Sequence, residues 1–434
     1  MPAKCAAPRA TAHLSQEYRT PAWEQRKLGE VGITYSGLHG KTKDDFGHGD
    51  AFFVPYTNVF DNPVTDQGRL EHVEVDSSQA EVKHGDVFFT VSSETPEEVG
   101  MSSIWLGNIR NVYLNSFCFG YRQDGSFDSL YLAYVLRSQS VRKQIELLAQ
   151  GISRFNISKN KVMNVEVPKP SLGEQRRIGA FLDRLDSLIT LHQGKYDKLC
   201  VLKKSMLDKM FPKGGSLYPE IRFAGFTDPW EQRKLGEVAT FGGGHTPSMS
   251  DSDNYEGGNV LWVTSQDVKS HYLDGTTTQI TEKGAKELTL YPAGSLVMVT
   301  RSGILRHTLP VAELRKPSTV NQDIRVILPQ ENYYGQWLLQ FFISRNKELL
   351  LEFGKTGTTV ESVDFSKMRD MVLLTPSLPE QQQIGRYFAR LDNLITLHQR
   401  KYDGCANPLF LERRISCRKP SHQNRCSATT TPSG

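Results

Sequence analysis

The chain repeats itself, and this duplication limits its fold more than any other feature of the sequence. The segment WEQRKLGEV occurs at residues 23–31 and again at 230–238. LDSLITLHQGKYD at residues 185–197 returns as LDNLITLHQRKYD at 391–403, which is 206 positions later. A repeat of this length is a whole module, far longer than the solenoid units of about 20–50 residues. The sequence therefore predicts two consecutive copies of one module with strongly diverged interiors.

The repeat also predicts the domain boundaries. We expect an atypical N-terminal extension (1–21), a globular domain (22–168), a spacer helix (169–213), a linker (214–228), a second globular domain (229–375), a shorter spacer helix (376–403) and an aberrant tail (404–434). Each globular domain combines β-rich runs, at 85–91 and 294–300, with one helical pattern, at 131–149 and 337–353. The expected fold class is α+β, with two α/β-type domains separated by long antiparallel helices in a pseudo-twofold arrangement.

The duplicated helices carry an apolar seam. Ser171 with Glu174, and Ser377 with Glu380, have the spacing of a capping box at the helix start. The seam positions step by threes and fours: Phe181, Leu185, Leu188, His192, Leu199 and Leu202 in the first copy, and Leu391, Leu394 and His398 in the second. If helical to residue 211, the first segment is about 60 Å long. We expect the two helices to pair as a coiled coil; the alternative is that each packs on its own domain.

The shared segments resemble the specificity subunit of a type I restriction–modification enzyme. The resemblance rests on the WEQRKLGEV openings at Trp23 and Trp230, on the PSLxEQxxIG…LDxLITLHQ helices at Ser171 and Ser377, and on TVSSETPEEVGMSSIW from Thr90. It implies that each domain reads one half of a bipartite site in double-stranded DNA. It also implies that the helices set the spacer and dock two methyltransferase subunits, which restriction/translocase subunits join. The chain would then contribute recognition and no catalysis, with S-adenosylmethionine, ATP and Mg bound only by partner subunits.

Candidate DNA contacts follow from the chemistry of base and phosphate recognition, which needs amide, hydroxyl and basic side chains on loops. In the second domain these are Arg301, Ser302, Arg306, His307, Asn321, Gln322 and Gln266. In the first domain they are Thr57, Asn58, Ser92, Ser93, Arg154, Lys159 and Lys161. The alternatives are solvated loop charges for the basic residues and turn or strand-end capping for Asn321, Gln266 and Asn58.

Enzyme motifs are not found. The run at Gly242 lacks the spacing of a dinucleotide loop, Asn407-Pro408 lacks the second proline of a methyltransferase tetrad, and the histidines form no H-E-x-x-H. Cys405, Cys417, Cys426 and His422 are too irregularly spaced to predict a zinc site. No run of about 18 apolar residues predicts a transmembrane helix, and six cysteines favour a reducing cytoplasm.

The formal net charge of +4 does not by itself indicate a nucleic-acid partner. Residues 404–434 contain five basic residues and one glutamate, a net of +4, so the two modules sum to about zero. DNA binding must then rest on local patches. Beyond residue 403 the second copy loses the heptad at Gly404 and Pro408, and we expect a disordered tail produced by a frameshift, truncation or recombination. The alternative function is a duplicated coiled-coil adaptor that binds proteins without DNA specificity.

Overall fold

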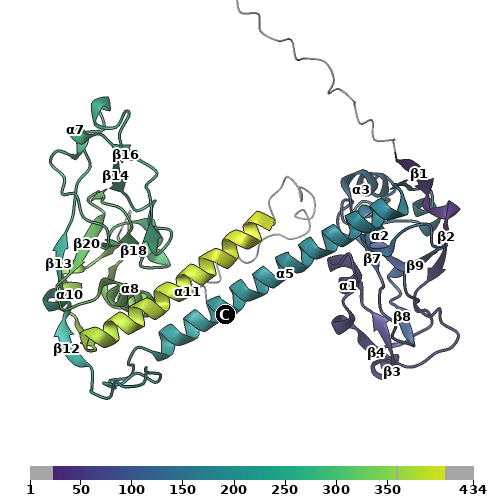
Figure 1. Cartoon of the computed structure of the whole chain (residues 1–434), viewed down its shortest axis with the longest axis horizontal. Coiled ribbons are helices and arrows are strands. Elements are labelled where there is room, and N and C mark those ends of the chain that lie inside the picture. The colour runs from purple at the N-terminus through teal and green to yellow at the C-terminus, as the bar shows by residue number, and fades with distance from the viewer. Residues whose placement is uncertain (1–22, 358–359, 406–434) are drawn as a thin grey trace, which may run out of the picture. The chain divides into compact units, whose positions relative to one another are not determined.

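The computed structural model describes residues 23–357 and 360–405 (Figure 1). The described chain divides into two compact units, 23–188 and 189–404, with the boundary inside one long helix between Leu188 and Ile189. The N-terminal extension (1–21) and the tail (404–434) predicted above lie outside the described residues, apart from the end of the second long helix. Below, domain 1 denotes residues 23–169 and domain 2 denotes residues 230–375.

Domain 1 is built from short strands and short helices, followed by one long helix. Its strands are β1 (Glu24–Lys27), β2 (Gly32–Ser36), β3 (Phe46–Val54), β4 (Glu71–Val73), β5 (Val87–Thr90), β6 (Ser92–Ser93), β7 (Ser102–Ile104), β8 (Val112–Leu114), β9 (Cys118–Gln123), β10 (Phe155–Asn156) and β11 (Glu166–Lys169). Its helices are α1 (Tyr56–Asp61), α2 (Ser129–Val135), α3 (Gln139–Glu146) and α4 (Lys159–Val162), and α5 (Leu172–Lys209) follows the domain.

Domain 2 contains the same kinds of element. Its strands are β12 (Glu231–Lys234), β13 (Ala239–Gly242), β14 (Val260–Val263), β15 (Tyr272–Leu273), β16 (Gln279–Ile280), β17 (Leu296–Val299), β18 (Val311–Leu314), β19 (Thr319–Val320), β20 (Ile324–Pro329), β21 (Gly354–Lys355), β22 (Ser362–Val363) and β23 (Val372–Thr375). Its helices are α6 (Leu235–Val238), α7 (Glu282–Ala285), α8 (Gly335–Ser344), α9 (Asn346–Phe353) and α10 (Phe365–Asp370), and α11 (Leu378–Cys405) follows.

The two domains share one topology. Domain 1 has a four-stranded sheet in the order β2-β9-β5-β7, and domain 2 has β13-β20-β17-β18 with β15 added at the edge. Each domain also has a three-stranded sheet, β4-β3-β8 or β16-β14-β19, whose central strand pairs antiparallel on one side and parallel on the other. The central strands β5 and β17 are buried throughout, as continuous apolar runs in the sequence predict. The duplication therefore extends to strand order even where the residues have diverged.

The helical pattern in each domain is broken into two helices, which corrects the expectation of one. The first pattern forms α2 and α3, because Ser138 adopts an extended backbone at the start of α3. The second forms α8 and α9, separated at Arg345. Asn346 holds this break in place, since its Oδ1 accepts hydrogen bonds from the Thr308 hydroxyl and the Leu309 N–H. Periodicity alone does not detect such a break, because the apolar spacing continues across it.

The helices that follow the domains are long. The 38 residues of α5 correspond to about 57 Å, and α11 has 28 residues. The expected cap at Ser171 is present, because its hydroxyl accepts the Glu174 N–H at 3.3 Å. Glu380 instead binds Arg222 through both carboxylate oxygens, so the predicted capping box at Ser377 is replaced by an ion pair. Among the described residues, none of the helices has both the length and the apolar content needed to cross a bilayer.

Candidate nucleic-acid interface and helix pair

The part of α5 that belongs to the second unit pairs antiparallel with α11, as Figure 1 shows. Three contacts show the direction of the pairing: His192 with His398, Lys203 with Asp392, and Phe211, just after α5, with Phe388. Residue numbers rise along one segment as they fall along the other. The Lys203 Nζ lies 2.6 Å from Asp392 Oδ1, and both side chains are nearly buried. These contacts confirm the antiparallel pairing of the duplicated helices.

The apolar seam is narrower than its heptad spacing predicts. Leu391 is buried and Leu185 and Leu199 are half-buried, whereas Phe181, Leu188, Leu202 and Leu394 are exposed among the described residues. The physical reason is that α11 divides its apolar surface between α5 and its own domain. Ile384 and Phe388 join a buried cluster that includes Trp337 and Leu338 of α8. The coiled coil and the packing of a helix on its own domain, which the sequence treated as alternatives, therefore occur together.

Two histidines meet across the helix pair. The Nδ1 atoms of His192 and His398 are 2.9 Å apart, and the ring centroids are separated by 5.2 Å. One imidazole must accept the proton that the other donates, so the contact requires at least one neutral ring. Desolvation, followed by the charges of His192, Lys195 and Lys401, lowers the pKa of His398. Desolvation and the nearby positive charges both favour the neutral form of His398.

A glutamine at the start of each long helix attaches it to its own domain. Gln175 Oε1 accepts the Asp128 N–H at 2.9 Å, and its Nε2 donates to the Pro170 carbonyl. Gln381 repeats both bonds 206 positions later, with the Tyr334 N–H and the Pro376 carbonyl. Both glutamines are buried, so each bond is made away from solvent. The repeated EQxxIG letters thus encode a buried polar attachment, which sequence reasoning did not identify.

A glycine and an aspartate complete this attachment. A Cβ at Gly179 would lie 2.6 Å from the Tyr131 N–H nitrogen, and one at Gly385 would lie 2.7 Å from the Tyr334 ring, so both positions require the close approach that only glycine allows. Farther along each helix, Asp186 accepts the Tyr134 hydroxyl at 2.9 Å, and Asp392 accepts the Tyr272 hydroxyl at 3.0 Å. The signal for these residues was their identity in two copies that otherwise differ.

In domain 2, several loops that carry predicted contact residues meet at the ends of strands. The Thr300 N–H donates to the Asp323 carbonyl, and the Asn321 N–H donates to the Val263 carbonyl. These bonds bring together the chain after β17, the chain before β20 and the end of β14. Gln322 is exposed and accepts the Thr246 hydroxyl at 2.6 Å. The structure therefore gathers Arg301, Gln322 and Gln266 near one end of the domain, on three different loops.

The predicted contacts on these loops have different environments. Arg301 and His307 are exposed, and among the described residues neither side chain has a hydrogen-bond or ion-pair partner. Arg306 forms an ion pair with Glu361, and Ser302 caps the short helix that follows it. Asn321 is buried, and its amide bonds only to Asp323. In this structure the Asn321 side chain is therefore buried in the turn before β20.

Gln266 is exposed on a turn that Asp267 stabilises. Burial opposes ionisation of Asp267, but hydrogen bonds from the backbone and hydroxyls of Thr277 and Thr264 outweigh it, so the pKa of Asp267 is lowered. Asp267 is therefore a structural residue of the turn. Gln266, in contrast, keeps its amide at the surface. The sequence left base contact and strand-end capping open for both residues; in the structure Asp267 stabilises the turn and Gln266 is exposed.

Sequence reasoning missed Arg325 in domain 2. It is exposed on β20, although both its neighbours in the strand are buried, and its guanidinium lies over Gly243, where a Cβ would come within 2.5 Å of Nη1. Gly242 and Gly244 similarly approach the Tyr291 hydroxyl and the Val320 carbonyl. The three glycines thus let the backbone pass beneath these groups. An arginine at an outward position of a buried strand was the available signal.

In domain 1 the predicted polar contacts are mostly internal. Asn58 is fully buried; its Nδ2 donates to the Asp66 and Arg69 carbonyls and its Oδ1 accepts the Asp66 N–H. It is a structural residue, and Thr57 beside it is exposed. Ser92 and Ser93 are also buried in the β6–β10 pair. These serines therefore position the backbone here and present little hydroxyl surface.

The predicted basic residues of domain 1 remain exposed. Arg154 precedes β10, whereas Lys159 and Lys161 lie on α4. The Lys159 ammonium is 3.5 Å from the Ser36 hydroxyl at the end of β2. Arg154 acts electrostatically on Tyr56, whose hydroxyl donates to the Ser92 carbonyl at 2.7 Å. All three basic residues thus remain at the surface, with Lys159 next to the end of β2.

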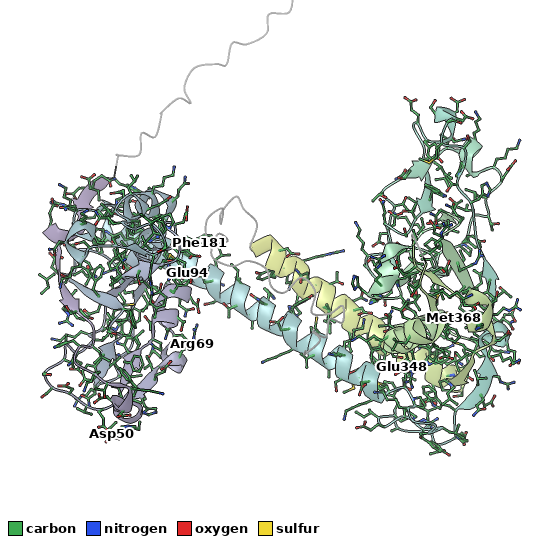
Figure 2. All side chains as sticks on the ribbon, turned by 180° about the vertical axis from the view of Figure 1, so that it is seen from behind. Asp50, Arg69, Glu94, Phe181, Glu348 and Met368 are labelled. Carbon is green, nitrogen blue, oxygen red and sulfur yellow. The ribbon has the colours of Figure 1, made fainter. Side chains whose placement is uncertain are left out.

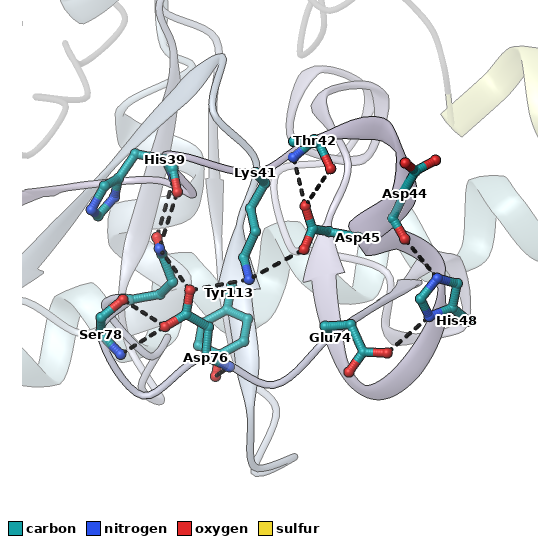
Figure 3. Close-up of polar contacts among 11 residues, drawn as sticks. His39, Lys41, Thr42, Asp44, Asp45, His48, Glu74, Asp76, Ser78 and Tyr113 are labelled. Atoms are coloured by element: carbon teal, nitrogen blue, oxygen red, sulfur yellow. Dashed lines mark hydrogen bonds and ion pairs between the residues drawn. The ribbon is translucent and has the colours of Figure 1, made fainter.

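A second polar surface of domain 1 was not predicted; it is formed by residues 39–50, which include the start of β3, and by residues 74–78, which follow β4 (Figure 3). Asp76 accepts hydrogen bonds from Ser78, and its carboxylate lies 3.0 Å from the Lys41 ammonium. The Ser78 hydroxyl and N–H, then Lys41, lower the pKa of Asp76. On the same surface, the His48 ring contacts the Glu74 carboxylate through Nδ1 and the Asp44 carbonyl through Nε2. These bonds join residues 41–48 to residues 74–78 and leave His39 and His48 exposed.

No group of three His, Cys, Asp or Glu side chains in the described part of the chain is arranged to hold a metal ion. The side chains of Cys405, Cys417, His422 and Cys426 lie outside the described residues.

Comparison with known proteins identifies the module. The model of the type I restriction modification DNA specificity domain matches residues 22–200 and again residues 227–404. The EcoR124I/EcoR124II specificity subunit of Escherichia coli is 27% identical over 274 residues, which cover 60% of this chain and 65% of that protein. The MjaIX specificity subunit of Methanocaldococcus jannaschii is 29% identical over 171 residues, which cover 38% of each chain. The chain thus spans less than two thirds of these two relatives.

The fold is also found in a solved structure. The S subunit of a type I restriction-modification system from M. genitalium matches with a TM-score of 0.51 at 13% identity, covering 90% of this chain and 95% of that one. This likeness agrees with the two tandem domains and long helices described above. Since the family model covers most of the chain in two consecutive copies, the chain belongs to the type I restriction-modification DNA specificity family.

Proposed function

We propose that the chain is the DNA specificity subunit of a type I restriction–modification enzyme and that each domain reads one half of a bipartite site. The proposal rests on a contrast within one chain. The residues that attach each domain to its helix are repeated in both copies, whereas the exposed residues of the two domains differ. Both domains are fixed to their helices by the same glutamine, glycine and aspartate. Their exposed polar residues differ, with Arg301, Arg325 and Gln322 in one domain and Thr57 and Arg154 in the other. One scaffold that presents two chemistries suits the reading of two different sequences.

The chemistry of the domain 2 loops supports this role. Arginine binds guanine edges and phosphates, and glutamine binds adenine edges in the major groove. Arg301 and Arg325 supply the first kind of group and Gln322 and Gln266 the second, and all four are exposed. Arg301, Gln322 and Gln266 lie on loops beside the sheet, which is the usual arrangement for a binding surface, and Arg325 extends the surface onto β20.

We further propose that this chain has no catalytic role. It would bind two methyltransferase subunits through α5 and α11, and restriction/translocase subunits would join that assembly. S-adenosylmethionine, ATP and Mg would then be bound by those partners. The exposed apolar residues Leu188, Leu202 and Leu394 on the helices offer contact area for such subunits. Because its partner would be the DNA of the cell, we propose the cytoplasm as its location.

The proposal is tested by co-expressing the chain with the methylation subunit and mapping the methylated bases. We expect a split consensus with two separate halves. Replacing Arg301 and Arg325 together by alanine should relax one half only. The control is Arg233→Ala, which removes an exposed arginine from β12, where it pairs with Glu231. Equal loss at both halves, or methylation without a consensus, would contradict the assignment of one half-site to each domain.

A further inference from the structure

One surface of the module, at the start of the long helix, is covered in the second copy and exposed in the first. We call this surface the acceptor face. It consists of Trp23, Glu174, Ile178, Phe181, Leu182 and Leu185 in the first copy, and of Trp230, Glu380, Ile384, Tyr387, Phe388 and Leu391 at the equivalent positions of the second. Because the residues correspond in number and largely in type, the two faces need the same kind of cover.

In the second copy the acceptor face is covered. Trp230 and Phe388 are 2% and 0% exposed. The covering residues are Leu207, Met210 and Phe211 at the end of α5, followed by Ile221 and Phe223. We call residues 206–223 the cover segment. Phe211 packs against Trp230 and Phe388 with ring centroids 6.1 and 6.5 Å apart. The cover segment thus completes the core of the second copy.

The cover segment also contributes a charge. The Arg222 Nε and Nη2 each lie 2.7 Å from an oxygen of Glu380, whose side chain is 1% exposed. A bidentate arginine–carboxylate pair of this geometry adds specificity as well as attraction. Phe223 packs edge-on against Tyr387, with the ring centroids 5.7 Å apart. An arginine between apolar residues is therefore part of the chemistry that this face recognises.

In the first copy no described residue plays this part. Trp23 is 43% exposed and Phe181, which Figure 2 labels on the part of α5 next to domain 1, is 57% exposed. The Glu174 carboxylate has no ion-pair partner among the described residues. The sequence supplies no equivalent cover segment, because Arg413, Ser416 and Cys417 stand 206 positions after Leu207, Met210 and Phe211. The residues before Trp23 likewise do not match those before Trp230.

We propose that the acceptor face of the first copy binds a segment of a second polypeptide that has the chemistry of the cover segment. The partner segment is a helix end with Leu, Met and Phe at three- and four-residue spacing, followed by Ile-Arg-Phe. Its apolar side chains cover Trp23, Phe181 and Leu185, and its arginine pairs with Glu174. The charge and shape complementarity at the second face, which has the same residue pattern, supports this occupant. It does not depend on DNA recognition.

The probe is a fluorescently labelled peptide of residues 199–226, added to the full chain and followed by fluorescence anisotropy. We expect saturable binding of one peptide per chain, and a blue shift of tryptophan emission that Trp23→Phe abolishes. Glu174→Gln should weaken binding by about 10-fold, because it removes one partner of a charge-assisted hydrogen bond. The same loss is expected when Arg222 of the peptide is replaced by alanine. Phe181→Ala should also weaken binding, and its exposure allows the change without loss of the fold.

Glu94→Gln is the matched control. Glu94 is an exposed carboxylate of domain 1 outside the acceptor face, so this variant should bind like the parent. A peptide of the same composition in scrambled order should not bind. The proposal is overturned if the scrambled peptide binds equally, or if Glu94→Gln and Glu174→Gln weaken binding alike. It is also overturned if the peptide fails to bind the full chain, which is the result expected if residues 404–434 occupy the face.

Discussion

His192 and His398 meet with their Nδ1 atoms 2.9 Å apart, at positions separated by one full repeat of 206 residues. The same residue of the repeated motif therefore contacts its own copy across the antiparallel helix pair. A heptad pattern places a histidine in the seam but does not show that its partner is the equivalent histidine. This self-contact places two titratable groups between the helices, toward the C-terminal end of α11.

The histidine pair makes the helix contact sensitive to acid. Desolvation and then the charge of His192 lower the pKa of His398 in the folded chain, so the unfolded chain takes up the proton first as the pH falls. The stabilisation is complete above the unfolded value of about 6.5 and is lost progressively below it. We expect the Tm to fall between pH 7.5 and 5.5, and to fall less in His398→Gln. An unchanged pH dependence in this variant would contradict the assignment.

Gly179→Ala should destabilise the first unit. The added Cβ would lie 2.6 Å from the Tyr131 backbone nitrogen, and overpacking of this kind costs about 1–3 kcal/mol. Gly173→Ala is the control in the same helix, because no atom lies within 4 Å of its added Cβ. That change should raise stability by up to about 1 kcal/mol through helix propensity. Chemical denaturation of both variants measures the difference, and equal effects would exclude the close approach as the reason for the glycine.

Asp392→Ala should strongly destabilise the second unit. It removes the partner of the nearly buried Lys203 ammonium and the acceptor of the Tyr272 hydroxyl. Leaving a buried charge unpaired costs about 3–5 kcal/mol. Asp403→Ala, an exposed aspartate on the same helix, should change stability by less than about 0.5 kcal/mol. Thermal unfolding followed by circular dichroism distinguishes the two.

Arg325 and Gln322 should differ in how they affect DNA binding. If Arg325 contacts phosphate, Arg325→Ala should weaken binding to all sequences and reduce the slope of log K against log salt by about 1. Gln322→Ala should instead relax the preference at one base pair and leave the salt dependence unchanged. Binding isotherms at several salt concentrations, on matched and single-mismatch duplexes, measure both. The reverse pattern would exchange the two roles.

Asp76→Asn should loosen the segment that leads from β2 into β3, to which Asp76 is tied through Lys41. The carboxylate accepts from Ser78 and pairs with Lys41, and an amide can replace only part of these contacts. Hydrogen exchange of residues 39–50 should become faster, while the central strand β5 keeps its protection. Asp50→Asn, an exposed aspartate of the same region, is the control. Equal exchange in both variants would show that Asp76 does not order the loop.

Side-chain roles on the loops were only partly predictable. Asn58 and Asn321 have the residue type of a base contact, but both are buried. Asn58 bonds to main-chain groups of the segment after α1, and Asn321 bonds to the neighbouring Asp323. Arg325 was not predicted because only loop residues were considered as DNA contacts, whereas Arg325 lies within β20. Amide side chains serve turns and bases with the same atoms, so composition alone does not separate these roles. Only the direction of each side chain decides which one applies.

The sequence by itself determined the tandem duplication, the strands at the centre of each domain, the long helices and the family, because repeated residues and apolar periodicity are local properties of the chain. The tertiary structure decided which repeated letters attach each domain to its helix, since Gln175, Gly179 and Asp186 act on partners up to 52 residues away. It also decided that identical motifs have different surroundings, with Trp230 buried and Trp23 exposed. The burial of a residue depends on which other segments pack against it. A repeated motif has the same residues in both copies, but the segments that pack against it can differ.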